Sequence, residues 1–139
     1  MNGSDRLGGC HCGAIRFSVI FPKGLTGSRC NCSICSMKGY VALYTPVASL
    51  QIVQGEDDLA MYSFHSGVAR HYFCQNCGIH CFHQARSDPD LYGVNAACLD
   101  DVSPFDFTEI PVADGKNHPR DNDGKRRLAG WLRFTAEAD

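Results

Sequence analysis

The stretch "CQNCG" (residues 74–78) constrains the fold more than any other short segment of this sequence. Two cysteines held close together in a tight turn can supply a pair of zinc ligands, at Zn–S distances of about 2.3 Å, without straining the chain. Gly78 follows the second cysteine, where a residue without a Cβ atom relieves the turn. Because zinc in a structural site takes four ligands, a second pair of cysteines is expected elsewhere.

The second pair lies near the start of the chain, in "CHCG" (residues 10–13). Joining the two pairs gives a closed Cys₄ site that ties the first expected strand to a hairpin far along the sequence. A zinc ion that crosslinks such distant segments contributes directly to folding. The sequence therefore predicts a structural zinc ion held by Cys10, Cys12, Cys74 and Cys77.

A third cluster, "CNCSIC" (residues 30–35), has three thiols and no fourth. Three protein ligands plus one exchangeable position is the pattern of a catalytic zinc ion. We therefore predict that Cys30, Cys32 and Cys35 hold a second zinc ion, which makes two Zn²⁺ per chain.

Two alternatives to an exchangeable position stay open at this point. One further side chain could close the second site, the candidates being Cys81, Cys98, His11, His65, His71, His80, His83 and His118. Alternatively only one zinc ion binds and the remaining thiols are buried, because free cysteines often lie in protein cores. For Cys98 the sequence favours a buried apolar thiol over a fourth ligand.

The pattern of apolar residues predicts strands rather than long helices. In residues 14–21, Ile15, Phe17 and Val19 alternate with Arg16 and Ser18, which is the period of a half-buried strand. Six more runs are rich in β-branched and aromatic residues and end in turn residues: "YVALYTPV", "LQIVQG", "LAMYSFHS", "ARHYFC", "IHCFHQ" and "LYGVNA". Only "SICSMKG" is expected to form a helical turn. The fold class is therefore mainly β.

Size and composition limit the organisation of the protein. A chain of 139 residues is expected to form a single domain, residues 1–139. Residues 114–127 are charged and rich in turn residues, and "LAGWLRF" after them is expected to be a terminal strand or tail that Trp131 pins down.

Charge and targeting signals limit the partners and the compartment. A net charge of -2 gives no positive field to attract nucleic acid or an acidic membrane. The first residues resemble no secretory signal, and nine cysteines, an odd number, in short-spaced sets favour metal ligands over disulfides. We expect a soluble, cytoplasmic protein that binds neither nucleic acid nor membrane.

Four segments together resemble a known family. In order and spacing, "GGCHCGAIRFSV", "CNCSICSMKG", "YSFHSGVARHYFCQNCGIHCF" and "YGVNAACLDD" are similar to the glutathione-dependent formaldehyde-activating enzymes and centromere protein V. The resemblance spans residues 8–118 and leaves residues 119–139 as a charged loop and tail. Two of the segments, "HYFCQNCGIHCFHQARSDP" and "NAACLDD", look closer to the centromere protein V branch.

The resemblance implies a fold, two metal sites and an activity. The implied fold is a set of coiled antiparallel sheets of the Mss4-like type, stabilised by zinc. The family's structural zinc maps onto Cys10, Cys12, Cys74 and Cys77, and its catalytic zinc maps onto Cys30, Cys32 and Cys35. The implied activity is that of a carbon–sulfur lyase that joins formaldehyde to glutathione as S-hydroxymethylglutathione. The partners would be a small thiol such as glutathione and an aldehyde.

Two other functions remain compatible with the sequence. The zinc ions could hold together a non-catalytic binding or scaffold module. Alternatively, "CNCSIC" could be the labile zinc site of a thiol sensor, which would lose its metal reversibly on mild oxidation. A closed second site would favour the scaffold module, whereas turnover that depends on the three thiols would favour the enzyme.

Several charged or titratable residues could contact a substrate. Lys38, Arg70 and Arg86 could pair with carboxylates, but isolated basic residues are usually solvated surface charges, and we interpret them so. His11 and His71 have the side-chain chemistry of general acids or bases. For both histidines a supporting hydrogen bond or simple exposure is the favoured interpretation.

Overall fold

The computed structural model describes residues 5–118, 121 and 123–138, and strands dominate these residues. A three-stranded sheet has the order β1-β2-β5, with β1 at Arg6–Gly9, β2 at Arg16–Val19 and β5 at Leu50–Gln54. An eight-stranded sheet has the order β11-β10-β3-β4-β9-β8-β7-β6. Its strands are β3 (Gly27–Cys30), β4 (Ala42–Pro46), β6 (Leu59–Tyr62), β7 (Arg70–Cys74), β8 (His80–Gln84), β9 (Leu91–Asn95), β10 (Glu109–Ala113) and β11 (Leu128–Arg133).

Helical structure in the described residues is short. The α-helix α1 covers Ser33–Lys38 and ends at Gly39, whose φ of 71° is the left-handed conformation common after a helix. Single turns of 3₁₀-helix are η1 (Val47–Ser49), η2 (Glu56–Asp58), η3 (Ala96–Cys98), η4 (Pro104–Asp106) and η5 (Gly115–Asn117). The segment "SICSMKG" thus forms the helical turn that the sequence predicts.

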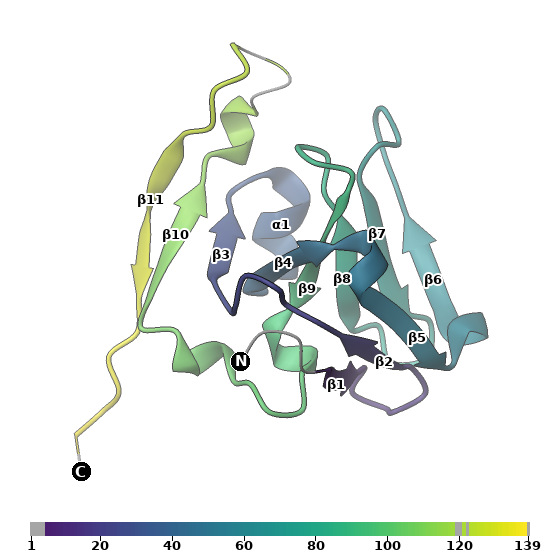
Figure 1. Cartoon of the computed structure of the whole chain (residues 1–139). Helices are drawn as coiled ribbons and strands as arrows, with labels where there is room; N and C mark the ends of the chain where they lie inside the picture. The colour runs from purple at the N-terminus through teal and green to yellow at the C-terminus, as the bar shows by residue number, and fades with distance from the viewer. Residues whose placement is uncertain (1–4, 119–120, 122, 139) are drawn as a thin grey trace.

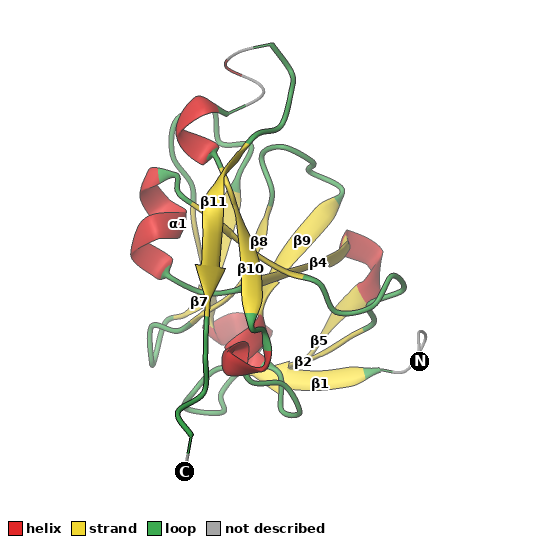
Figure 2. Ribbon diagram, turned by 90° about the vertical axis from the view of Figure 1, so that its left-hand side faces the viewer, coloured by secondary structure: helices red, strands yellow, loops and turns green. Residues whose placement is uncertain are grey.

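The two sheets meet around one hydrophobic core. Figure 1 shows the β10–β11 hairpin at one side of the molecule, β3 and α1 beside it, and the small sheet of β1, β2 and β5 at the base. In Figure 2, α1 stands beside the strands of the large sheet. Ile15, Phe17 and Val19 are fully buried, as their alternation predicts, and the ring of Phe17 contacts that of Phe82 edge-on at 6.0 Å. The small sheet therefore packs against the large one through β2 and β8.

The mainly-β prediction is confirmed, and all six predicted runs contain a strand, β4 to β9. One pair departs from the antiparallel pairing of the implied fold: β10 pairs with β3 in parallel, with Val112 opposite Arg29 and Ala113 opposite Cys30. Strands joined by a tight hairpin must be antiparallel. The long connection between β3 and β10 imposes no such direction.

Strands β1, β3 and β10 were not predicted, and glycine explains the first two. A Cβ atom on Gly8 would lie 2.6 Å from the carbonyl oxygen of Cys98, and one on Gly27 would lie 2.7 Å from Cγ1 of Val41. These positions need glycine because another segment passes closely. Glycine has a low β-propensity, so the residues that allow this close packing also make the segments look unlike strands in the sequence.

The predicted terminal strand is present as β11, which pairs antiparallel with β10. Trp131 lies opposite Pro111 and is 48% exposed, so backbone pairing holds this strand more than burial of the indole ring does.

Part of the predicted charged loop, residues 119–120 and 122, lies outside the described residues. None of the described helices has the length and apolar character needed to cross a lipid bilayer. The single-domain organisation stays a prediction.

Candidate metal centre and substrate cleft

The structure brings Cys10, Cys12, Cys74 and Cys77 together as one cluster, with all four Sγ atoms within 4.8 Å of one another. The Sγ atom of Cys12 lies 3.6 Å from that of Cys10 and 3.7 Å from that of Cys74. Four sulfurs around a zinc ion at 2.3 Å would lie about 3.8 Å apart in a tetrahedron. The cluster therefore fits a tetrahedral, sulfur-binding metal ion.

Backbone hydrogen bonds shape the two turns that carry these cysteines. In the first turn the backbone N–H of Ile15 donates to Sγ of Cys10 at 3.3 Å. In the second, the N–H of Asn76 donates to Sγ of Cys74 at 3.3 Å, and Gly78 closes the turn at φ 77°. Hydrogen bonds to sulfur favour the thiolate form that binds metal. Both turns are thus preformed for ligation.

The second cluster, which we call the cysteine trio, consists of Cys30, Cys32 and Cys35. Cys30 ends β3, Cys32 is the N-cap residue of α1, and Cys35 lies one turn further along the helix. Residues three apart on a helix share a face, so Cys35 lies beside Cys32. The three Sγ atoms lie within 4.8 Å of one another, and the N–H of Cys32 bonds to Sγ of Cys30 at 3.4 Å.

Among the described residues, which include every cysteine and histidine, no fourth ligand atom joins the trio within that distance. Cys81 and Cys98 are buried elsewhere in the core, where their thiols contact the carbonyl oxygens of Ile79 and His80. The buried interpretation of Cys98 is thus confirmed. The candidate fourth ligands considered from the sequence do not close the trio in this structure.

Thiol–thiol hydrogen bonds dominate the electrostatics of the trio. The hydrogen bond with Cys30 lowers the pKa of Cys32, and the same contact raises the pKa of Cys30. Hydrogen bonds with Cys30 and Cys32 raise the pKa of Cys35. One thiolate shared between two thiols is the physical meaning of this pattern. A divalent cation would allow all three to ionise, because a coordinated thiol loses its proton. The donor set is soft and suits zinc.

The loop after β10 covers one side of the trio. Asn31 fastens it: the backbone N–H of Lys116 donates to Oδ1 of Asn31 at 3.1 Å, and the N–H of Asn31 donates to the carbonyl oxygen of Ala113 at 3.2 Å. A Cβ atom on Gly115 would lie 2.4 Å from Sγ of Cys30. Only glycine fits here without displacing the thiol. Neither Asn31 nor Gly115 was recognised from the sequence, because nothing local marks their contact.

A small cavity of about 10 Å³ lies beside the trio. Its lining includes Cys30, Cys35, Lys38, Tyr40 and His83. A volume of this size holds about one water-sized group. The cavity therefore offers a place beside the thiols for a small ligand atom.

Lys38 is the centre of a polar network around this cavity. Its Nζ lies 3.0 Å from Nδ1 of His71 and 3.3 Å from the hydroxyl of Tyr40. The hydroxyl of Tyr40 donates to the carbonyl oxygen of Gly93 at 3.1 Å and makes a short contact with Nδ1 of His83. The interpretation of Lys38 as a solvated surface charge is therefore wrong. Lys38 contacts His71 of β7 and Tyr40, and the hydroxyl of Tyr40 in turn contacts His83 of β8.

Burial shapes the titration of this network. It lowers the pKa of His71 to about 4, with a smaller contribution from the Lys38 ammonium. Burial lowers the pKa of His83 well below its ordinary value. Burial also lowers the pKa of Lys38 and raises that of Tyr40. Both histidines are thus neutral hydrogen-bonding groups near neutral pH. His71 is buried and hydrogen-bonded to Lys38, so the alternative of simple exposure does not hold for it.

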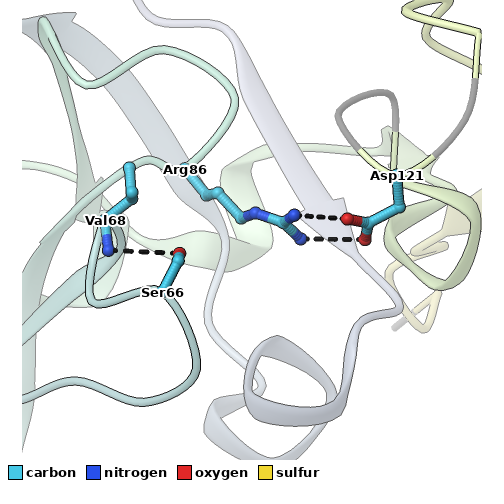
Figure 3. Close-up of polar contacts among 4 residues, drawn as sticks. All are labelled: Ser66, Val68, Arg86 and Asp121. Atoms are coloured by element: carbon cyan, nitrogen blue, oxygen red, sulfur yellow. Dashed lines mark hydrogen bonds and ion pairs between the residues drawn. The ribbon is translucent and has the colours of Figure 1, made fainter.

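The other residues considered from the sequence lie away from the trio's cavity. Arg86 forms a two-pronged ion pair with Asp121, with nitrogen–oxygen distances of 2.9 and 2.5 Å (Figure 3). The same view shows the nearby turn in which the N–H of Val68 donates to Oγ of Ser66. Arg70 and His11 are exposed. Arg86 is therefore engaged within the protein, contrary to its interpretation as a solvated charge.

A wider groove of about 440 Å³ adjoins the cavity. Arg29, Lys38 and Tyr40 line both spaces. Asn95 also lines the groove, but its side chain serves the backbone: it donates to the carbonyl oxygen of His80 and accepts from the N–H of Ala97. Arg29 was not singled out from the sequence, since a lone arginine in a short strand carries no local signal.

Comparison with known proteins identifies the family. The family model of the glutathione-dependent formaldehyde-activating enzyme matches residues 5–111. The chain belongs to this family. All seven clustered cysteines of this formaldehyde-activating-enzyme family member lie inside the matched segment. Gly115 and β11 lie after the end of that segment. The closer likeness to the centromere protein V branch is not tested and stays a prediction.

Two known proteins are similar to this chain. A Halomonas elongata protein, provisionally named a glutathione-dependent formaldehyde-activating enzyme, is 32% identical over 78 residues. That alignment covers 50% of this chain and 50% of the relative, so the match spans about half the length of either protein. The crystal structure of a Rhodobacter sphaeroides protein is 41% identical, with a TM-score of 0.74, and covers 76% of this chain and 98% of that one.

Proposed function

We propose that this family member is a zinc-dependent carbon–sulfur lyase that forms or cleaves a thiol–aldehyde adduct such as S-hydroxymethylglutathione. The observation that carries this proposal is the cysteine trio, which has three converging thiols, no fourth protein ligand among the described residues, and a cavity beside it. A ligand set of this kind leaves one coordination position for substrate. The name of the family supplies glutathione and formaldehyde as the first candidates.

The proposal assigns different roles to the two cysteine clusters. Cys10, Cys12, Cys74 and Cys77 would hold a structural zinc ion, and Cys30, Cys32 and Cys35 would hold the catalytic one. When bound at the trio, Zn²⁺ supplies a thiophilic Lewis acid that stabilises a substrate sulfur as thiolate at neutral pH. Three thiolates and one Zn²⁺ sum to a charge of -1, which favours a sulfur ligand over strong activation of water.

The reaction itself needs little chemistry from the protein. In the synthetic direction the thiol sulfur forms a bond to the aldehyde carbon, and the thiol proton ends on the former carbonyl oxygen as a hydroxyl group. Cleavage reverses both changes, so atoms and charge balance in either direction. The protein therefore contributes mainly by holding sulfur and carbonyl carbon in contact.

Lys38 is placed to assist at the oxygen. An ammonium group has three protons. Two of those on Nζ are directed at His71 and Tyr40, which leaves one for a ligand in the cavity. A donor beside a developing alkoxide stabilises the negative charge. We propose that Lys38 donates to the aldehyde oxygen during bond formation.

Exchange spectroscopy with ¹³C-formaldehyde and glutathione tests this function, since it reports the rate at which adduct and free components interconvert. The wild-type protein loaded with two equivalents of Zn²⁺ is expected to accelerate the exchange, and Cys32→Ser is expected to abolish the acceleration. Cys98→Ala, a buried thiol outside both clusters, serves as the control and should retain it. Exchange at the uncatalysed rate with the wild-type protein would overturn the proposal.

The remaining expectations follow from this chemistry. Glutathione is a thiol of reducing compartments, so a cytoplasmic location suits both the substrate and nine unpaired cysteines. We therefore propose a small thiol and an aldehyde as the partners and the cytoplasm as the compartment. Fractionation of cells followed by immunodetection would check the location.

A further inference from the structure

The groove beside the trio has an apolar wall, which a molecule as small as formaldehyde would not contact. Phe105, Phe107, Ile110, Leu132 and Phe134 contribute apolar surface to it. Leu132 and Phe134 are 45% and 41% exposed, and the ring of Phe105 lies 5.2 Å from that of Phe134. Apolar side chains gathered in an exposed groove commonly mark a ligand site. An adduct of formaldehyde adds a single carbon, which would leave this wall in water.

Arg29 lies where the groove meets the trio. It precedes Cys30 in β3 and lines both the groove and the small cavity. Its Nε is buried and has no hydrogen-bond partner among the residues that the structure describes. In contrast, Nε of Arg133 on the groove's edge donates to Oε2 of Glu109 at 2.8 Å. Arg29 is thus the groove's available guanidinium.

A guanidinium group with a buried N–H that lacks a partner, as in Arg29, gains stability from an anion. Burying a charge is costly unless it is paired, and carboxylates match the fork of N–H donors on arginine. Lys38 is less available, since His71 and Tyr40 engage it. The Arg29 guanidinium and the apolar side chains of the groove together favour an amphipathic anion as the ligand. Its carboxylate would lie near the trio and its apolar chain along Leu132 and Phe134.

We propose that the groove binds adducts between a carboxylate-bearing thiol and an apolar aldehyde larger than formaldehyde. The carboxylate pairs with Arg29, the sulfur lies at the trio, and the alkyl or aryl group of the aldehyde lies on Phe107, Leu132 and Phe134. This inference rests on the proposed function for the chemistry at sulfur. The binding of the apolar chain is independent of turnover and can be measured separately.

Unreactive thioethers test the apolar wall. S-methylglutathione and S-hexylglutathione have the same charges and differ by five methylene groups, each worth about fourfold in affinity when fully buried. Because the groove is partly open, calorimetric titration of the zinc-loaded protein should show S-hexylglutathione binding at least roughly tenfold more tightly. Leu132→Ser should remove most of this difference. Leu128→Ser, on the same strand and similarly exposed but outside the groove, should preserve it.

Esterification tests the carboxylate pairing. The wild-type protein should bind S-hexylglutathione roughly tenfold more tightly than its diethyl ester, since a charge-assisted pair is lost. Arg29→Gln should bind acid and ester alike. Arg70→Gln, an exposed arginine that does not line the groove, should behave as the wild type. Equal discrimination by the wild type and Arg29→Gln would overturn the role of Arg29.

The outcomes separate this inference from the proposed lyase. Equal affinities for the methyl and hexyl thioethers would overturn the apolar site even if S-hydroxymethylglutathione is turned over. Selective hexyl binding without any turnover would uphold the groove and overturn only the lyase. If sedimentation shows that Leu132→Ser dissociates a dimer and leaves thioether binding unchanged, the wall is a contact between two copies and the inference fails.

Discussion

Gly115 lies so close to Cys30 that a Cβ atom at that position would be 2.4 Å from the cysteine Sγ and 2.8 Å from Cβ of Cys32. This contact joins the turn that follows β10 to the trio, which lies far earlier in the sequence. Asn31, between the two cysteines, fastens the same turn through its amide group. The geometry of the trio therefore depends on a loop outside the segment that matches the family model.

Replacing Gly115 with alanine should weaken metal binding at the trio. The added methyl group must displace the turn or the thiol of Cys30, so we expect about tenfold lower zinc affinity at this site, the loss typical of disturbed support around a metal. Competition with a chromogenic chelator would measure it. Gly130→Ala adds a methyl group into open space and should leave the affinity unchanged. Equal affinities for wild type and Gly115→Ala would contradict the steric argument.

The two clusters should differ in their effect on folding. Cys74 is fully buried where the two cysteine turns meet, and structural zinc supplies about 10–16 kcal/mol of folding free energy, as much as a typical domain has in total. We expect Cys74→Ser to unfold the protein. Cys35→Ser should lose one zinc ion and keep the fold. Far-UV circular dichroism with elemental analysis would show both, and comparable unfolding in the two variants would argue against separate roles.

Stability should fall as the pH drops below about 6.5, partly because of His71. Its pKa is about 4 in the folded protein and near 6.5 when unfolded, so between these values the unfolded state binds more protons. From pH 7.5 to 5.5 this group should lower the free energy of unfolding by about 1 kcal/mol. Denaturant unfolding would measure the change. His71→Gln should show a smaller pH dependence, while any loss of zinc at low pH affects both proteins.

Lys38→Met should raise the pKa of His71. Burial is the larger cause of the low pKa and the ammonium of Lys38 the smaller one, so the pKa should move from about 4 toward 6.5 without reaching it. Titration of the imidazole signals by NMR gives this value directly. Lys23→Met, at an exposed lysine outside the network, is the matched control. An unchanged His71 pKa in Lys38→Met would show that the two groups do not interact electrostatically.

The strands that the sequence predicted are those with enough local signal. Ile15, Phe17 and Val19 alternate with polar residues, and all three are fully buried, Phe17 and Val19 within β2 and Ile15 directly before it. By contrast, β1 and β3 consist partly of glycines that make room for Cys98 and Val41. Glycine is required at these positions by a contact with a residue far away in sequence, so no local pattern predicts the strand.

The candidate site divides in the same way. Cysteine spacing alone identified both clusters, because a tight turn with two or three thiols has few other uses. The network of Lys38, Tyr40, His71 and His83 was not recognised, nor was Arg29, because each of these residues is unremarkable in its own segment. Only the pairing of β7 with β8 places His71 opposite His83, and only the folded chain brings Lys38, at the end of α1, within hydrogen-bond distance of His71.

By itself the sequence determined the mainly-β class, the family motifs and which thiols group together, since all of these depend on short-range spacing. The tertiary structure decided which residues surround the trio. Gly115 lies against Cys30, and the network of Lys38 and His71 lies beside the small cavity. Arg29, whose Nε has no hydrogen-bond partner among the described residues, lines the apolar groove. These features arise from contacts between segments distant along the chain. Their energies depend on burial and distance, which are properties of the folded molecule alone.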